Sequence, residues 1–190
     1  MRKIALIALI AAAPLSAIAN PFGAQAASGL SYDYVGAGYA SLDPSGVSRL
    51  DGFGVDGSVA INQNFHLKAD FIRGKDSPVT LRRTRAAAGF HMPLDSNVDL
   101  VARLGWSFAK GKVSGVGSAS DDGVLGQVGV RGMINAALEL NTFVTYDDID
   151  SKASFDLGAV YNFTPEFGAT AGYSYSSDVE IWNIGLRYNF

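Results

Sequence analysis

The chain lacks cysteine entirely, and charged residues make up only 17% of its 190 residues. Without cysteine there are no disulfides, no thiolate metal ligands, no thiol nucleophile and no lipid-modified N-terminal cysteine. A charged fraction this low lies below the roughly 25% of typical soluble domains. Long apolar runs are missing after the N-terminal region, since no later segment reaches the roughly 18 apolar residues of a transmembrane helix.

The N-terminal residues have the pattern of an export signal. Arg2 and Lys3 precede an apolar run at residues 4–13, which is the length of a signal-peptide core and too short to span a bilayer. Small-residue cleavage motifs end at Ala19 and at Ala26. We prefer the second, because the sequence just before it has no strand pattern.

This choice divides the chain into a signal peptide at 1–26 and a mature domain at 27–190. Loss of the two N-terminal bases leaves 13 bases against 18 acids, a net charge of −5. A nucleic-acid partner is therefore not expected, because it requires a basic face. An exported chain without a helical span can still enter a membrane as a closed β-barrel.

Polar and apolar residues alternate through most of the mature chain. The alternation is clearest at 53–61, 98–108 and 137–146, and it predicts strands with one apolar and one polar face. Each segment is long enough to cross a bilayer as a tilted strand. Ten strands are expected, near residues 30–41, 52–62, 65–73, 81–91, 98–108, 123–134, 137–147, 153–163, 167–176 and 179–190.

Short Asn/Asp/Pro turns alternate with longer polar connections, of which 109–122 is the longest. This pattern is typical of outer-membrane barrels, with short periplasmic turns and longer loops outside. The expected fold is therefore all-β: a transmembrane antiparallel up-and-down barrel of about ten strands, with eight as the alternative. An even count places both termini in the periplasm. A soluble β-sandwich shares the alternation, but the export signal and the aromatic residues disfavour it.

Large aromatic residues lie near the strand ends on the apolar face, as in the interfacial girdles of membrane barrels. The residues expected at the two levels are Tyr32, Phe65, Phe90, Phe163, Phe167 and Tyr188 at the first, and Phe71, Trp106, Phe108, Tyr146 and Trp182 at the second.

The same alternation places nearly equal numbers of acidic and basic residues on the inner face. The acids are Asp33, Asp56, Asp70, Asp99, Glu139, Asp147 and Asp156, and the bases are Lys68, Arg83, Arg85, Arg103, Arg131 and Arg187. Because an unpaired buried charge is costly, these residues should pair across strands, Asp70 with Arg85 for example. They either form a network that fills a narrow barrel, or line a small polar channel with Arg83, Arg85, Arg103 and Arg131 as a basic ladder.

The final residues, NIGLRYNF, place Asn183 and Gly185 on the inner face, and Tyr188 and Phe190 on the lipid face. This order resembles the C-terminal signal by which bacterial outer-membrane barrels are recognised for assembly through strand pairing. The whole chain resembles small OmpA/OmpX-like barrels. More narrowly, residues 29–42 and the terminal RYNF resemble the Ax family, small outer-membrane proteins named as activators of XA-mediated immunity.

An enzyme is not expected. Barrel enzymes need a positioned base, usually histidine, and the only two histidines, His66 and His91, are expected opposite each other near the periplasmic ends of neighbouring strands. GxSxG, HExxH and P-loop motifs are missing, and we expect no catalytic, cofactor or metal site. Simple solvation explains the outer carboxylates better than an aspartate-only hydrolase or a weak Ca²⁺ site: Asp121, Asp122, Asp147, Asp148 and Asp150.

The sequence thus predicts a non-enzymatic outer-membrane barrel with a structural or surface-interaction role through its outer loops, such as adhesion in a virulence-associated setting. A narrow channel for ions or small solutes is the alternative. The expected partners are outer-membrane lipid and lipopolysaccharide, periplasmic chaperones and the barrel-assembly machinery, together with a host or cell-surface ligand. Release in outer-membrane vesicles is compatible with this location.

Overall fold

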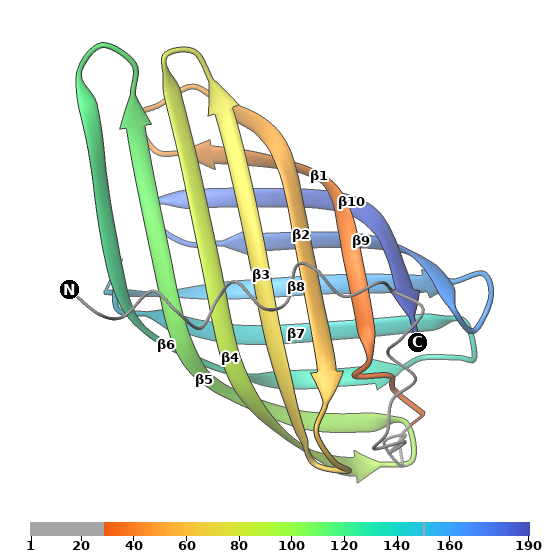
Figure 1. Ribbon diagram of the computed structural model, residues 1–190. Coiled ribbons are helices and arrows are strands. Elements are labelled where there is room, and N and C mark those ends of the chain that lie inside the picture. Colours follow the sequence, from red (N-terminus) through yellow and green to blue (C-terminus); the bar gives the residue numbers. More distant parts are fainter. Residues whose placement is uncertain (1–28, 150) are drawn as a thin grey trace.

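A computed structural model describes residues 29–149 and 151–190, which form a closed antiparallel barrel (Figure 1). Each strand pairs with its neighbours in chain order, and the first pairs with the last to close the ring. The strands are β1 (Tyr34–Pro44), β2 (Leu50–Ala60), β3 (Phe65–Asp76), β4 (Val79–Asp95), β5 (Val98–Val113), β6 (Gly117–Met133), β7 (Leu138–Asp147), β8 (Lys152–Asn162), β9 (Phe167–Tyr175) and β10 (Val179–Asn189).

The predicted barrel and its ten strands are therefore confirmed, and the alternative of eight strands is wrong. Within the described part of the chain, no helix has the length and apolar character needed to cross a membrane. The predicted signal peptide, 1–26, lies outside the described residues.

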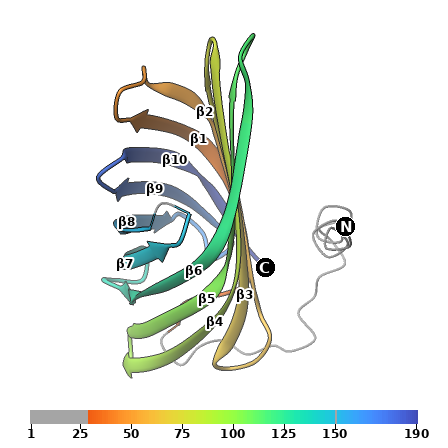
Figure 2. The same cartoon turned by 90° about the vertical axis from the view of Figure 1, so that its left-hand side faces the viewer.

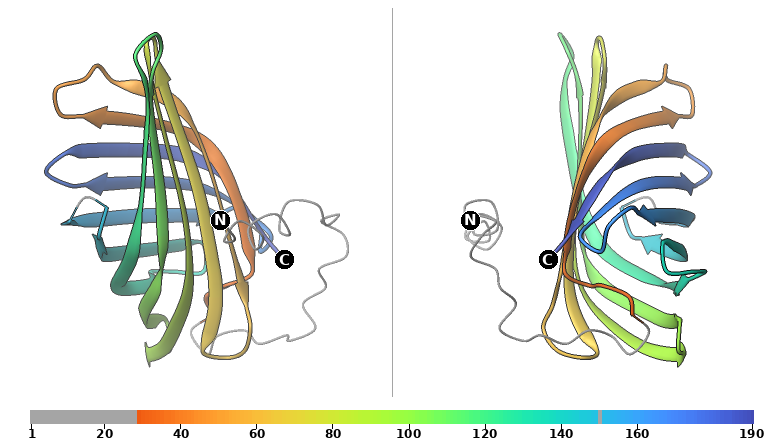
Figure 3. Two further views of the ribbon diagram at one scale, coloured as in Figure 1. Left: turned by 60° about the vertical axis from the view of Figure 1, so that its left-hand side comes forward. Right: turned by 90° about the vertical axis from the view of Figure 1, so that its right-hand side faces the viewer.

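The two ends of the barrel are distinguished by the turns that they carry. The C-terminus lies beside the start of β1, at the end that carries the turns after β2, β4, β6 and β8 (Figure 3). We call this the periplasmic end, following the predicted orientation, and the opposite end the outer end.

The predicted long outer loop at 109–122 is wrong, because most of it is strand. β5 and β6 remain paired out to Val113 and Gly117, so only three residues connect them. The glycine and serine content of this segment suggested a loop, but its backbone groups are satisfied by cross-strand pairing. The turn itself needs glycine at position 115, where φ is +83°.

The outer end is dominated by two long hairpins, β3–β4 and β5–β6. β4, β5 and β6 have 17, 16 and 17 residues, well beyond the roughly 9–11 needed to cross a bilayer. Their tips lie side by side in Figure 2, where the Ser114 amide donates a hydrogen bond of 2.9 Å to the Pro78 carbonyl. These hairpins are therefore the main structure at the outer end of the barrel (Figure 1).

The barrel is inverted relative to a soluble protein, with charge inside and apolar surface outside. On β5, Leu104 is 68% exposed while the neighbouring Arg103 is only 8% exposed. The same alternation continues around the ring, with exposed Val, Leu, Phe and Trp side chains facing outward. Such a surface is stable only in contact with lipid.

Candidate functional site

The inner face near the periplasmic end carries a buried cluster of three charged residues. Arg131 on β6 donates from Nε to Glu139 Oε1 on β7 at 2.9 Å, and Arg187 on β10 donates from Nη1 to Glu139 Oε2 at 3.2 Å. The side chains of Arg131, Glu139 and Arg187 are 4%, 4% and 6% exposed. One carboxylate thus holds two guanidinium groups that meet from two sides of the lumen.

The segment before β1 folds into the same end of the lumen. The Ser31 carbonyl accepts hydrogen bonds from Arg131 Nη2 at 3.1 Å and from Arg187 Nη2 at 3.0 Å. Arg131 also lies over the Tyr32 ring, 4.4 Å from its centroid, and Arg187 lies 3.8 Å from that of Tyr34. These contacts anchor residues 30–34 against the cluster.

Tyr32 is therefore not a residue of the aromatic girdle, contrary to the prediction. Its side chain is only 3% exposed and its hydroxyl donates to Asp99 Oδ2 at 2.9 Å inside the lumen. The alternation used to assign Tyr32 does not extend to this segment, because β1 begins at Tyr34. No sequence signal distinguishes this inserted segment from a strand.

The two histidines meet beside Tyr32. His66 Nδ1 and His91 Nδ1 lie 3.2 Å apart, and the His91 ring stacks on the Tyr32 ring at 3.7 Å between centroids. Arg103 Nε donates to His66 Nε2 at 3.0 Å. Because a guanidinium can only donate, His66 Nε2 is the acceptor, and its Nδ1–H is left to donate to His91.

Together these groups form a packed layer across the lumen, which we call the periplasmic layer. Every member is less than 9% exposed, so the side chains leave little room between them. Its members are Leu30, Tyr32, His66, His91, Asp99, Arg103, Arg131, Glu139 and Arg187.

Two further ion pairs lie on the inner face above this layer. Lys68 Nζ on β3 donates to Asp56 Oδ2 on β2 and to the Tyr34 hydroxyl, both at 3.0 Å. Arg85 Nε on β4 donates to Asp70 Oδ2 on β3 at 2.9 Å. Each pair joins neighbouring strands, which fixes their register.

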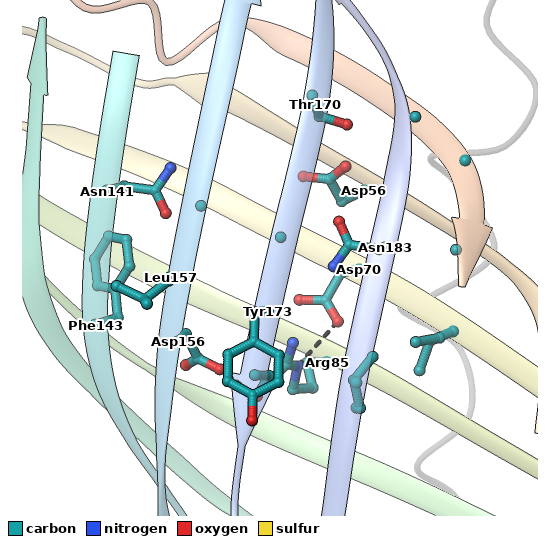
Figure 4. Close-up of a pocket in the computed structure, with 18 of the residues that line it drawn as sticks. Asp56, Asp70, Arg85, Asn141, Phe143, Asp156, Leu157, Thr170, Tyr173 and Asn183 are labelled. Atoms are coloured by element: carbon teal, nitrogen blue, oxygen red, sulfur yellow. Dashed lines mark hydrogen bonds and ion pairs between the residues drawn. The ribbon is translucent and has the colours of Figure 1, made fainter. Parts of the chain in front are cut away.

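A cavity of about 300 Å³ lies in the lumen above this layer, and both ion pairs contribute to its lining (Figure 4). Polar side chains from opposite sides of the ring line it, including Asp56, Asp70, Asn141 and Asn183. The lining runs from the periplasmic layer to residues at the outer rim, such as Lys152. The lumen is thus a chamber whose floor is the periplasmic layer.

The charges expected in the lumen do not form a continuous ladder of bases. Arg85 and Arg131 are paired with carboxylates, and Arg83 lines the cavity. Arg103 instead donates to His66 and to the Gln127 side chain. Asp156 accepts from the hydroxyls of Thr145 and Ser174, and Asp99 accepts from Tyr32.

No group of three His, Cys, Asp or Glu residues within 29–149 and 151–190 could hold a metal ion.

An apolar cluster also faces the lumen, near the outer end. Ala40, Leu42 and Leu50 are at most 5% exposed and pack against Ile72 and Leu81. This cluster was not predicted from the sequence. The sequence did contain a signal for it, because Ala40 and Leu42 are at even positions of β1 and so face inward like Gly36 and Gly38.

The remaining aromatic residues expected in the girdles lie on the outer face. At the periplasmic end, Phe65 and Phe90 face each other across β3 and β4 at 5.2 Å, and Phe167 packs on Tyr188 at 5.0 Å. The outer face also carries Phe53 and Tyr173, which the sequence analysis omitted: Tyr173 packs on Trp182 at 4.3 Å. Phe71, Trp106, Phe108, Tyr146 and Phe163 are half-buried or exposed on this face.

The C-terminal residues form the seam that closes the barrel. Gly185 pairs with Gly38 across β10 and β1, and the Phe190 amide donates to the Asp33 carbonyl at 3.1 Å. The backbones approach so closely here that a Cβ at Gly38 would clash with the Ile184 carbonyl oxygen. Glycine is therefore required on at least one side of the seam.

A closed ten-stranded barrel with an apolar outer face and a charged interior is an integral outer-membrane β-barrel protein. The chain belongs to the family described as outer membrane protein beta-barrel domain, whose model matches residues 5–190. The protein is accordingly located in the outer membrane. Curated protein sequences gave no match.

Solved structures of outer-membrane barrels are similar to the chain at low identity. Ail, the attachment invasion locus protein of Yersinia pestis, is 19% identical over 85% of this chain and 100% of that one, with a TM-score of 0.42. The KdgM porin is 10% identical over 82% and 99%, with a TM-score of 0.47. OprG of Pseudomonas aeruginosa is 14% identical over 88% and 99%, with a TM-score of 0.45. The narrower resemblance to the Ax family stays a prediction.

Proposed function

We propose that this outer-membrane barrel is a non-conducting surface-interaction protein that acts through its outer hairpins and has no catalytic role. The observation that carries the proposal is the periplasmic layer. A channel needs a continuous water path, and buried, mutually bonded side chains fill the lumen at this level. The lining of the chamber above it reaches residues at the outer rim, such as Lys152, which supports access from outside rather than passage through the barrel.

The long hairpins support a role in contacts outside the cell. β4, β5 and β6 are longer than a membrane crossing requires, and the hairpins β3–β4 and β5–β6 are joined at their outer tips. A paired sheet is a more defined binding surface than a mobile loop, because less conformational entropy is lost on binding. A host or cell-surface ligand is the partner that this surface would contact.

The position of the histidines supports the non-enzymatic part of the proposal. His66 and His91 are 0% and 2% exposed and lie within the periplasmic layer. A general base must come within hydrogen-bond reach of its substrate, and neither ring is accessible from the outer end.

Planar-bilayer recording tests whether the barrel conducts. The wild-type protein should give no reproducible current steps. The double substitution L30G/Y32G removes the two inserted side chains and should open the periplasmic layer, so that steps appear. Steady steps from the wild-type protein would refute the non-conducting function and favour the narrow channel.

A shortened hairpin tests the surface-interaction role. Deleting 111–113 and 117–119 keeps the connection 114–116 and the pairing of Lys110 with Ser120. This variant should assemble as a barrel but lose adhesion of barrel-expressing bacteria to host-type cells. Unchanged adhesion by the variant would exclude the β5–β6 tip as the contact surface.

A further inference from the structure

The outer face of the barrel carries five basic residues close together on three neighbouring strands. Arg73 and Lys75 lie on β3, Arg82 on β4, and Lys110 and Lys112 on β5. In the alternation along each of these strands, they occupy the positions that face the lipid and not those that face the lumen. We call this set the basic patch.

The members of the basic patch face each other directly. In the strand register Arg73 lies opposite Arg82, and Arg82 lies opposite Lys110 on the next strand. Like charges directly opposite each other in a sheet are destabilising. No ion pair or hydrogen bond joins the side chains of these three residues to any other part of the described chain, 29–149 and 151–190. None of these three cations therefore has an ion-pair partner in the described chain.

Two acids lie on the same face, and each accepts a hydrogen bond from an uncharged side chain. Asp51 is the register partner of Lys75 but accepts a hydrogen bond from the Tyr39 hydroxyl at 2.5 Å. Asp122 accepts from Trp106 Nε1 at 2.8 Å. Neither forms an ion pair with a residue of the patch, and five bases against two acids leave this face with an excess of three positive charges.

The height of the patch matches the outer headgroup level of a membrane. On β3 the outward residues run from Phe65 to Phe71 without a charge, and Arg73 follows, eight positions after Phe65. At about 3.4 Å per residue and a tilt of about 40°, Arg73 lies about 21 Å above the periplasmic girdle. The apolar band of such barrels is about 25 Å tall, so the patch lies at its outer edge.

We propose that the basic patch is a binding site for the phosphate groups of lipid A in the outer leaflet. Arg73 and Arg82 offer planar guanidinium groups that suit bidentate contacts to phosphate, and the lysines supply further positive charge. A phosphate between strands replaces the repulsion of Arg73, Arg82 and Lys110 with charge-assisted hydrogen bonds. The site lies outside the lumen and does not depend on whether the barrel conducts.

A charge-matched pair of variants tests the site. R82Q/K110Q removes two register neighbours from the patch. R49Q/K152Q removes two exposed cations elsewhere at the outer end, where they pair with Asp43 and Asp178. The barrel is folded in neutral detergent with increasing diphosphoryl lipid A, and the temperature at which its unboiled gel mobility is lost is recorded. Without lipid, both variants should fold. R82Q/K110Q should melt no lower than the wild type, because a like-charge contact is removed, and R49Q/K152Q slightly lower, because two exposed bridges are lost.

Lipid A should raise the unfolding temperature of the wild type and of R49Q/K152Q equally. For R82Q/K110Q the lipid A concentration at half effect should rise about tenfold, the loss expected from one charge-assisted hydrogen bond or more. Phosphatase-treated lipid A should give little stabilisation. An equal response of the two variants would overturn the proposal, as would an equal effect of phosphatase-treated lipid A or of phosphatidylglycerol at the same phosphate concentration.

Discussion

Replacing Glu139 with glutamine should strongly destabilise the barrel. Glu139 is the only carboxylate that contacts Arg131 and Arg187 in the described structure, and these two guanidinium groups are 4% and 6% exposed. E139Q keeps the size of the side chain but leaves two buried cations without a counter-charge. Breaking a buried pair in this way costs about 3–5 kcal/mol, because the remaining charge is neither hydrated nor paired.

Reversible urea unfolding in phosphatidylcholine vesicles measures this loss. Trp106 and Trp182 lie on the lipid face, so their fluorescence reports transfer between water and lipid. The control is K152Q, which breaks an exposed bridge to Asp178 and should cost at most about 1 kcal/mol. E139Q/R131M removes one uncompensated cation and should be more stable than E139Q alone. A loss for E139Q no larger than that for K152Q would refute the buried cluster.

Three further predictions concern closure, membrane contact and assembly. Gly38→Val should prevent closure of the seam, because its Cβ would clash with the Ile184 carbonyl, and the heat-dependent gel shift should vanish. The control, Gly126→Ala, should keep the shift, because an added Cβ at that position meets nothing within 4 Å. Leu104→Arg should lower the free energy of unfolding in vesicles by about 2–4 kcal/mol, since position 104 is exposed on the lipid face, and a loss below about 1 kcal/mol would contradict that placement. Deletion of Phe190 should reduce the amount of heat-modifiable barrel in the membrane fraction, and an unchanged amount would contradict its role in assembly.

The strands and their two faces were predictable from the sequence because a strand has a strict period of two. The alternation along β5 assigns Arg103 to the lumen and Leu104 to the lipid face without knowledge of any other strand. Register within a hairpin was partly predictable as well, and Asp70 lies opposite Arg85 in the structure. These features depend on local pattern and on short turns.

The floor of the lumen was not predictable, because it depends on contacts between distant strands. Arg187 reaches Glu139 across 48 positions, and Arg103 reaches His66 across 37. Such contacts depend on the stagger of the strands around the closed ring. The alternation of residues along a single strand does not predict that stagger. The insertion of Tyr32 depends on the same geometry. The long hairpins were missed because glycine and serine in a paired strand have the composition of a loop.

Thiol labelling from each side of a vesicle tests most directly whether the lumen is open outside and closed toward the periplasm. The chain has no cysteine, so single cysteines can be introduced without background. Ser154→Cys lies in the chamber, while Ser177→Cys and Ser96→Cys, in turns at the outer and periplasmic ends, report the orientation of the barrel. A charged, membrane-impermeant thiol reagent should label Ser154→Cys only from the side that labels Ser177→Cys. Labelling of Ser154→Cys from the side that labels Ser96→Cys would contradict a closed periplasmic layer.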